Sequence, residues 1–243
     1  IELDHGYIRA YASKLKGQRI DLETPTVTGT ENLMMAACLA KGTTIINNVA
    51  MEPEIEDLAN FLNQRGANIT GAGTGRIVIE GVSHLHEAEY SVMPDRIETG
   101  TYLIAAMVTH GDVEVDRCVP GHLDSLVSKL RECGADIHET TDSIRVKSSR
   151  KIQSKDIQTF PYPGFPTDLQ AQIMAMMSVA DGTSVITENV FEGRFLHVPE
   201  LQRMGASITV DGPRAVVKGV LQLTGAQVMA SDLRASAGLI LAG

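Results

Sequence analysis

The sequence contains no tryptophan, and aromatic residues make up only 4% of it. Its three cysteines, Cys38, Cys118 and Cys133, show no CxxC spacing. That favours a reducing, cytoplasmic compartment over a disulfide scaffold or a structural zinc site. Basic residues are outnumbered, 21 against 30 acidic ones, which gives a net charge of −9. This balance argues against broad nucleic-acid binding, although a small anionic substrate needs only a few well-placed arginines.

Two further absences narrow the class of protein. No apolar run is long enough to cross a membrane, so we expect no membrane partner. The seven histidines show no metal-ligand spacing, so we expect no metal site. Hydrophobic residues nevertheless make up 43% of the 243-residue chain, which is enough for one large core or two small ones.

What the sequence does contain is repetition. Three segments that read as amphipathic helices end in a Gly-Ala pair, and the glycines Gly66, Gly134 and Gly205 recur at intervals of 68 and 71 residues. A period near 70 with mixed helix and strand is too long for a common solenoid unit. It favours a βαβαββ unit that is used several times around an axis.

Each repeat opens on a helix that is apolar almost all round. The four examples are 31–40, 101–108, 169–179 and 233–242. A helix without a polar face is expected to be buried on every side. The second helices carry one apolar stripe instead, such as Ile55, Leu58, Phe61 and Leu62, and are expected at the surface.

These patterns predict an α/β fold of the inside-out barrel type with pseudo-threefold symmetry, in which strands and amphipathic helices surround buried helices. Runs 76–79 and 215–218 read as its strands. Pro94 interrupts strand pairing between two repeats, which predicts a first domain over residues 1–93 and a second over 94–243. The chain begins like the last hairpin of an earlier repeat and stops within the first helix of another. We therefore expect a fragment of a longer protein, incomplete at both ends.

The starts of the apolar helices are the candidate sites for chemistry. Segments 28–31 and 167–170 fit the capping box, Ser/Thr followed three residues later by Glu/Gln. Arg234 and Arg96 lie near helix starts, where the helix dipole disfavours cations. Such arginines suit phosphate or carboxylate groups; ion pairs with Asp232 and Asp95 are the simpler alternative.

Asp168 opens an apolar helix after a run of three prolines. It is either a first-turn residue favoured by the helix dipole or a general base at a cleft, and the pattern leaves both readings open. Cys118, a loop cysteine beside Arg117, is a candidate reactive thiol. The glycine-rich segment 71–75 lacks the lysine and the following helix of a phosphate loop, so it predicts a hairpin turn.

Several longer motifs carry a resemblance to a known family. They include Pro94-Asp95-Arg96-Ile97-Glu98-Thr99-Gly100-Thr101, Phe165-Pro166-Thr167-Asp168-Leu169-Gln170-Ala171-Gln172, Glu192-Gly193-Arg194-Phe195 and Ser231-Asp232-Leu233-Arg234-Ala235-Ser236. In order and over essentially the whole chain, these motifs resemble the UDP-N-acetylglucosamine enolpyruvyl transferases. The resemblance implies transfer of the enolpyruvyl group of phosphoenolpyruvate to the sugar 3′-hydroxyl with release of phosphate. That reaction is the first committed step of peptidoglycan synthesis, and it needs no metal or redox cofactor.

The resemblance also implies roles for individual residues. Asp168 matches the aspartate that contacts the sugar 3′-hydroxyl and is the favoured general base. The remaining candidate substrate-binding residues are Thr24, Pro25, Thr26 and Val27 for the uridine part, Val190 for the UDP-sugar, Arg194, Asp232 and Arg234 near the phosphoenolpyruvate, and Glu52, Asp95 and Arg96 within matched motifs.

The chain departs from the family pattern in places. It reads Val27-Thr28-Gly29-Thr30 where the family has Val-Gly-Ala-Thr. The family's Lys-Asn pair, its mobile loop with a reactive cysteine and its C-terminal arginine have no counterpart in this sequence, so we expect no turnover from these 243 residues alone. Cys118 occupies a similar place in its repeat to that loop cysteine but belongs to the other domain, and we interpret it as unrelated.

Two alternatives remain at this point. The sister enzymes that act on shikimate 3-phosphate share the fold, although the Thr167–Gln172 and Asp232–Ser236 motifs favour the UDP-sugar enzymes. A non-catalytic ring or clamp is a rival of another class. A clamp on DNA would line its channel with basic helices, whereas the repeat-opening helices here are apolar.

Overall fold

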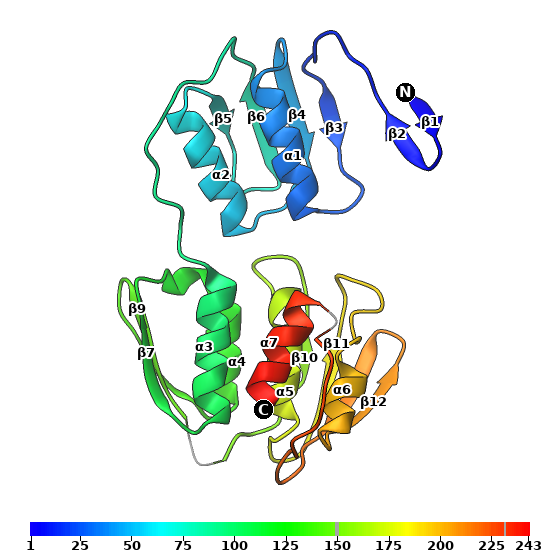
Figure 1. Cartoon of the computed structure of the whole chain (residues 1–243). Coiled ribbons are helices and arrows are strands. Elements are labelled where there is room, and N and C mark those ends of the chain that lie inside the picture. Colours follow the sequence, from blue (N-terminus) through cyan, green and yellow to red (C-terminus); the bar gives the residue numbers. More distant parts are fainter. Residues whose placement is uncertain (149–150, 231) are drawn as a thin grey trace. The chain divides into compact units, whose positions relative to one another are not determined.

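The computed structural model describes residues 1–148, 151–230 and 232–243 (Figure 1). The chain divides into two compact units, Ile1–Met93 and Pro94–Gly243, which are described separately below as unit 1 and unit 2. Among the helices of these described residues, none combines the length and the apolar character that crossing a membrane requires.

Unit 1 holds a short hairpin and one complete βαβαββ repeat. The hairpin pairs β1 (Glu2–Asp4) with β2 (Tyr7–Arg9). The repeat runs β3 (Arg19–Asp21), α1 (Val27–Cys38), β4 (Thr43–Asn47), α2 (Pro53–Gln64), β5 (Asn68–Thr70) and β6 (Arg76–Glu80). Its sheet has the order β3-β4-β6-β5, with β3 parallel to β4 and the other pairs antiparallel. Segment 71–75 is the turn between β5 and β6, as predicted.

Unit 2 contains this arrangement twice, the first time without an opening strand among the described residues. One part runs α3 (Arg96–Val108), β7 (Asp112–Asp116), the 3-10 turn η1 (Pro120–His122), α4 (Asp124–Glu132), β8 (Asp136–Glu139) and β9 (Ser143–Lys147), with sheet order β7-β9-β8. The next runs β10 (Ile157–Gln158), the 3-10 turn η2 (Thr167–Leu169), α5 (Gln170–Met177), β11 (Thr183–Thr187), α6 (Val198–Arg203), β12 (Ser207–Asp211) and β13 (Arg214–Lys218), with order β10-β11-β13-β12. The chain closes with α7 (Leu233–Ala242).

The repeated Gly-Ala pairs have a common structural cause. Gly66, Gly134 and Gly205 follow α2, α4 and α6 with φ of 93°, 99° and 90°, a region that residues with a Cβ rarely adopt. After each helix the next alanine N–H donates to a carbonyl five residues back, as from Ala206 to Leu201 at 3.0 Å. This is the Schellman ending, which satisfies the last carbonyls of a helix. The period seen in the sequence is therefore a period of helix ends.

Replacing Gly205 with alanine tests this explanation with little steric interference. An added Cβ would meet its nearest neighbour, the Thr224 hydroxyl, at 3.5 Å, so the cost is that of the left-handed backbone, about 1 to 2 kcal/mol. Gly225→Ala is the matched control, because Gly225 has open space and no left-handed φ. Urea unfolding followed by circular dichroism should show the loss for Gly205→Ala alone; equal stabilities would contradict the assigned role.

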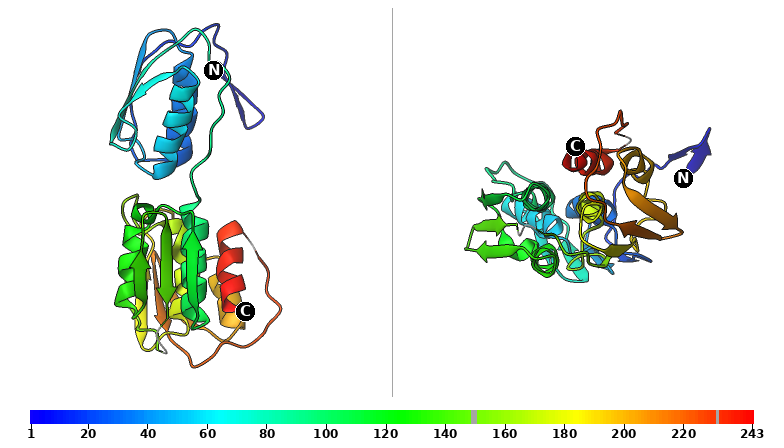
Figure 2. Two further views of the ribbon diagram at one scale, coloured as in Figure 1. Left: turned by 90° about the vertical axis from the view of Figure 1, so that its left-hand side faces the viewer. Right: turned by 90° about the horizontal axis from the view of Figure 1, so that it is seen from below.

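The burial of the repeat-opening helices only partly follows the prediction. Every residue of α5 is buried, because α5 packs against both α3 and α7 as well as its own sheet (Figure 2). The expectation is wrong for one residue of α3, since Tyr102 is 56% exposed. It fails more widely for α1 and α7: Met35 is 45% exposed, and Leu233 and Ile240 are 82% and 78% exposed. These helices are covered on one side only within the described residues, so their apolar character exceeds what their own unit buries.

Two predicted helix starts are also corrected. The α1 cap is Thr26, whose hydroxyl accepts a hydrogen bond from Gly29 N at 3.3 Å, rather than Thr28. Thr26 has the extended backbone that a capping residue requires, while Thr28 already lies inside the helix. Likewise α3 begins at Arg96 rather than near Thr101, because Asp95 caps it by accepting from Ile97 N and Glu98 N at 2.7 and 3.1 Å.

Candidate active site

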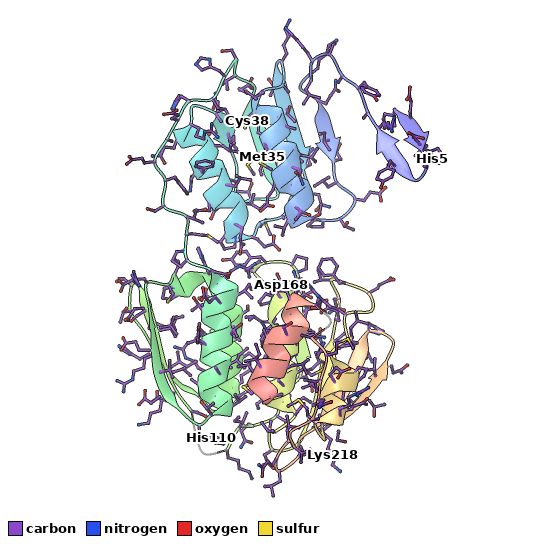
Figure 3. The ribbon with its side chains drawn as sticks, viewed as in Figure 1. His5, Met35, Cys38, His110, Asp168 and Lys218 are labelled. Atoms are coloured by element: carbon purple, nitrogen blue, oxygen red, sulfur yellow. The ribbon has the colours of Figure 1, made fainter. Side chains whose placement is uncertain are left out.

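Asp168 occupies the middle of η2, the single 3-10 turn that leads into the buried helix α5. Pro166 before it is extended, and Leu169 after it is fully buried against Gly100 of α3. These two neighbours fix the backbone, while the Asp168 side chain stays 31% exposed. Within unit 2, Figure 3 places Asp168 at the end where α7 begins, and His110 and Lys218 at the opposite end.

Two arginines from distant segments converge on this carboxylate. Arg194 Nη2 donates to Asp168 Oδ1 at 3.0 Å, and Arg234 Nε donates to the same oxygen. Among the described residues, no hydrogen bond reaches the other oxygen, Oδ2. The arrangement holds the carboxylate by one oxygen and leaves the second able to accept a proton from a bound hydroxyl group.

Arg234 therefore pairs with Asp168 instead of with its neighbour Asp232. Asp232 caps α7 by accepting from Arg234 N and Ala235 N, both at 2.9 Å. These backbone N–H groups, Ala235 first, hold the pKa of Asp232 below its ordinary value. The simpler reading of Arg234, an ion pair with Asp232, is wrong; Ser231, which precedes this pair in the motif, lies outside the described residues.

The second arginine lies in the loop after β11. Its guanidinium carbon is 4.5 Å from the centre of the Phe191 ring, and the side chain is only 18% exposed. Burial and the like charge of Arg234 lower the pKa of Arg194 below its ordinary value. Two guanidinium groups that crowd together in this way favour an anion between them.

Thr167 does not form the predicted capping box with Gln170. Its hydroxyl donates to Glu188 Oε2 at 2.9 Å and accepts from Arg194 Nη1 at 2.5 Å. The side chain is thereby drawn toward the loop after β11 and away from the helix end, and Pro166 caps η2 without a side-chain hydrogen bond. Sequence reasoning missed Glu188 altogether, although an acidic residue directly after a β-branched strand was a usable signal.

The other candidates of unit 2 have structural surroundings of their own. Val190 is half-buried in the loop after β11, and its N–H donates to Glu188 Oε1 at 2.9 Å. Arg96 is buried, with its guanidinium carbon 5.7 Å from the centre of the Tyr162 ring. Asp95 is the α3 cap already described. The substrate-binding roles of these residues stay predictions.

The remaining candidates belong to unit 1. Thr24, Pro25 and Thr26 are exposed in the loop between β3 and α1, and Val27 is the half-buried first residue of α1. Glu52 immediately precedes α2. A loop that ends at a helix N-terminus suits an anionic or polar ligand, and the predicted role in holding uridine stays a prediction.

The three thiols contribute nothing to this site. Cys38, Cys118 and Cys133 are free and buried. Burial raises the pKa of Cys118 above its ordinary value and that of Cys133 to about 11. Cys118 donates a hydrogen bond to the Val115 carbonyl at 3.5 Å. A buried protonated thiol is a poor nucleophile, which removes the reason to treat Cys118 as reactive.

The arrangement of repeats occurs in solved enolpyruvyl transferases. The chain matches the enolpyruvyl transferase NikO from Streptomyces tendae with a TM-score of 0.81 at 24% identity, over 95% of this chain and 58% of that one. It matches EPSP synthase from Acinetobacter baumannii with a TM-score of 0.67 at 19% identity, over 94% of this chain and 56% of that one. These likenesses show that the fold is the enolpyruvyl transferase fold. The chain belongs to the family described as EPSP synthase (3-phosphoshikimate 1-carboxyvinyltransferase), whose sequence profile matches residues 1–243.

Curated relatives are closer in sequence than the solved structures. The UDP-N-acetylglucosamine 1-carboxyvinyltransferase of Myxococcus xanthus (strain DK1622) is 58% identical over 243 residues, and that of Geobacter metallireducens is also 58% identical. The corresponding transferase 1 of Caldanaerobacter subterraneus subsp. tengcongensis is 56% identical. Each match includes all of this chain but only 58% to 59% of the relative, so the chain spans less than two thirds of their length.

Proposed function

We propose that this chain forms part of a UDP-N-acetylglucosamine 1-carboxyvinyltransferase. The observation that carries the proposal is the Asp168 carboxylate held at Oδ1 by Arg194 and Arg234, with Oδ2 left available. The relatives at 56% to 58% identity, each with that printed activity, support the choice of acceptor.

The proposed reaction gives Asp168, Arg194 and Arg234 one role each. The sugar 3′-hydroxyl oxygen bonds to C2 of phosphoenolpyruvate, its proton passes to Asp168 Oδ2, and C3 of phosphoenolpyruvate gains a proton from a separate general acid. The bond from C2 to the phosphate oxygen then breaks, and C3 returns a proton to that general acid. The proton on Asp168 passes to the leaving phosphate, so the enol ether and inorganic phosphate remain and both groups return to their starting states. Asp168 thus acts as general base at a fixed hydroxyl. Arg194 and Arg234 stabilise the anionic carboxylate and phosphate groups of the second substrate.

The same proposal gives the two units and the remaining candidates a place. Unit 1 corresponds to the end of the first transferase domain, and unit 2 to most of the second. The loop 24–27 contacts the uridine part, and Val190 contacts the UDP-sugar. The free, buried state of all three cysteines agrees with a cytoplasmic site of reaction.

A second acceptor must be tested because the family description names 3-phosphoshikimate. The experiment measures phosphate release from phosphoenolpyruvate by the protein as its complete gene encodes it, with UDP-N-acetylglucosamine or shikimate 3-phosphate as acceptor. We expect release with the UDP-sugar and none above background with the shikimate ester. Phosphate release with the shikimate ester alone would assign the sister activity. No release with either acceptor would refute carboxyvinyl transfer.

A further inference from the structure

Glu188 is a buried acidic residue that has no role in the proposed reaction. It follows β11 directly and is only 4% exposed. A buried carboxylate requires compensating hydrogen bonds, and Glu188 accepts four of them. Oε1 accepts from Thr159 Oγ1 at 2.8 Å, from Val190 N at 2.9 Å and from Phe191 N at 3.1 Å, whereas Oε2 accepts from Thr167 Oγ1 at 2.9 Å.

The two oxygens of Glu188 thereby hold two different segments of the site. Oε1 fastens the start of the loop that carries Arg194, through the N–H groups of Val190 and Phe191. Oε2 fastens Thr167, the residue that precedes Asp168. One carboxylate therefore ties the segment with the anion-binding arginine to the segment with the proposed base.

The direction of the hydrogen bonds makes a carboxylate necessary at this position. A threonine hydroxyl has one proton to donate, and Thr167 donates it to Glu188 Oε2. Its oxygen is then free to accept from Arg194 Nη1 at 2.5 Å, while Arg194 Nη2 donates to Asp168. Arginine has only donors, so a donor at the Oε2 position would compete with Arg194 for the same hydroxyl oxygen.

We propose that Glu188 is a positioning residue that acts through the Thr167 hydroxyl to hold Arg194 on Asp168 Oδ1. Its effect on turnover rests on the proposed function; its effect on Arg194 does not. The alternative is a buried acid that only closes the loop after β11. Both readings predict lost stability when Glu188 is changed, so stability alone does not separate them.

The test compares variants that break different bonds of this network. Glu188→Gln keeps an acceptor for the backbone N–H groups and places an amide donor against Thr167. We expect kcat for phosphate release to fall about 10- to 100-fold, the scale of a small misplacement at a reacting centre. Thr167→Val should lower kcat by as much, and Thr167→Ser, which keeps the hydroxyl group, should have a kcat close to that of the original protein. Thr159→Val is the matched control, because it removes a bond to Oε1 and the acceptor of Asn189 N at the start of the same loop but leaves the Thr167 link to Arg194 intact. Its kcat should stay within about threefold of the original.

A double variant separates a relay from independent effects. If Glu188 acts through Thr167, Glu188→Gln combined with Thr167→Val should be no slower than the slower single variant. Losses that multiply, or a Glu188→Gln enzyme as active as the Thr159→Val control, would overturn the proposal. Should Glu188→Gln fail to fold, the comparison of Thr167→Val with Thr167→Ser still decides it, since a serine that restores nothing would also overturn it.

A spectroscopic readout keeps this inference distinct from the proposed function. The side-chain Nε–H signal of Arg194, assigned by its loss in Arg194→Lys, is expected to shift in Glu188→Gln and in Thr167→Val but not in Thr159→Val. If the unaltered protein transfers to neither acceptor, the proposed function fails while these shifts still test the positioning. An Arg194 signal that is unchanged in Glu188→Gln would overturn the positioning itself.

Discussion

Replacing Asp168 with asparagine is expected to lower kcat for carboxyvinyl transfer by about 10²- to 10⁴-fold, the usual contribution of general acid–base catalysis. Asparagine has nearly the same shape and keeps an oxygen that can accept from Arg194 and Arg234 at the Oδ1 position. At the Oδ2 position it presents an NH2 group, which donates a proton and takes none. The sugar hydroxyl would then have no acceptor for its proton as the new bond to carbon forms.

The measurement is phosphate release at saturating concentrations of both substrates, because a base that acts only in the transition state affects kcat more than KM. Asp136→Asn, at the exposed start of β8 in the same unit, removes an equal charge and should leave kcat unchanged. Asp136 pairs with Lys147, which pairs in turn with Asp112 close to His110, at the end of unit 2 opposite Asp168 (Figure 3). An Asp168→Asn enzyme with kcat within about threefold of the original would refute the base role. The proposed activity would survive that result, and Asp168 would become an anchor for the two arginines.

The fold was largely predictable because its signals are local. A helix ending that needs a left-handed residue leaves a glycine in the sequence each time it is used, so the spacing of Gly66, Gly134 and Gly205 alone indicates the repeat. The alternation of apolar and polar residues likewise indicates strands such as β6 and β13. Apolar residues spaced three and four apart indicate the amphipathic helix α2. Apolar content alone was a poorer guide, because it reports what a helix is suited to bury rather than what covers it, as Met35 and Ile240 show.

The site was less predictable because its decisive contacts join distant segments. Thr167 reads as a helix cap from its neighbours, yet its hydroxyl is used by Glu188 and Arg194, which lie 21 and 27 residues further along the chain. Arg234 reads as the partner of Asp232, yet it donates a hydrogen bond to Asp168, which lies 66 residues earlier in the chain. Local propensity gives way wherever a tertiary hydrogen bond to a charged group is stronger than the local alternative. Asp168, Arg194 and Arg234 were found as candidates individually, but their convergence on one oxygen was not.

The largest expected effect on stability comes from His197, which is 3% exposed and lies at the N-cap of α6. Burial lowers its pKa from 6.5 to about 4, against the opposing attraction of Asp232. His197 therefore binds a proton near pH 6.5 in the unfolded chain but only near pH 4 in the folded protein. Stability from this group is complete above pH 6.5 and falls by about 3 kcal/mol as the pH drops through that window.

The Asp232 carboxylate does not obscure this effect. Its folded pKa lies below 3.8, so the stability that it contributes is lost at lower pH than the His197 window. Because the protein has no tryptophan, urea unfolding is best followed by circular dichroism, at intervals between pH 7 and pH 4. His197→Gln, which is neutral throughout, should remove the dependence attributed to this residue even if it lowers stability at every pH.

The matched control is His138→Gln, since His138 is exposed on β8 of the same unit and meets water in both folded and unfolded states. We expect its pH dependence of unfolding to match that of the original protein. If His197→Gln and the original lose stability in parallel between pH 6.5 and pH 4, His197 accepts its proton in the folded state. The helix α6 would then have to open around it or admit water beside Met174, whose sulfur lies 3.2 Å from Nε2. Between pH 6.5 and pH 4 the original protein should lose about 3 kcal/mol more unfolding free energy than His197→Gln loses. That result would show that the segment joining Arg194 to α6 stays closed and dry as the solution is acidified.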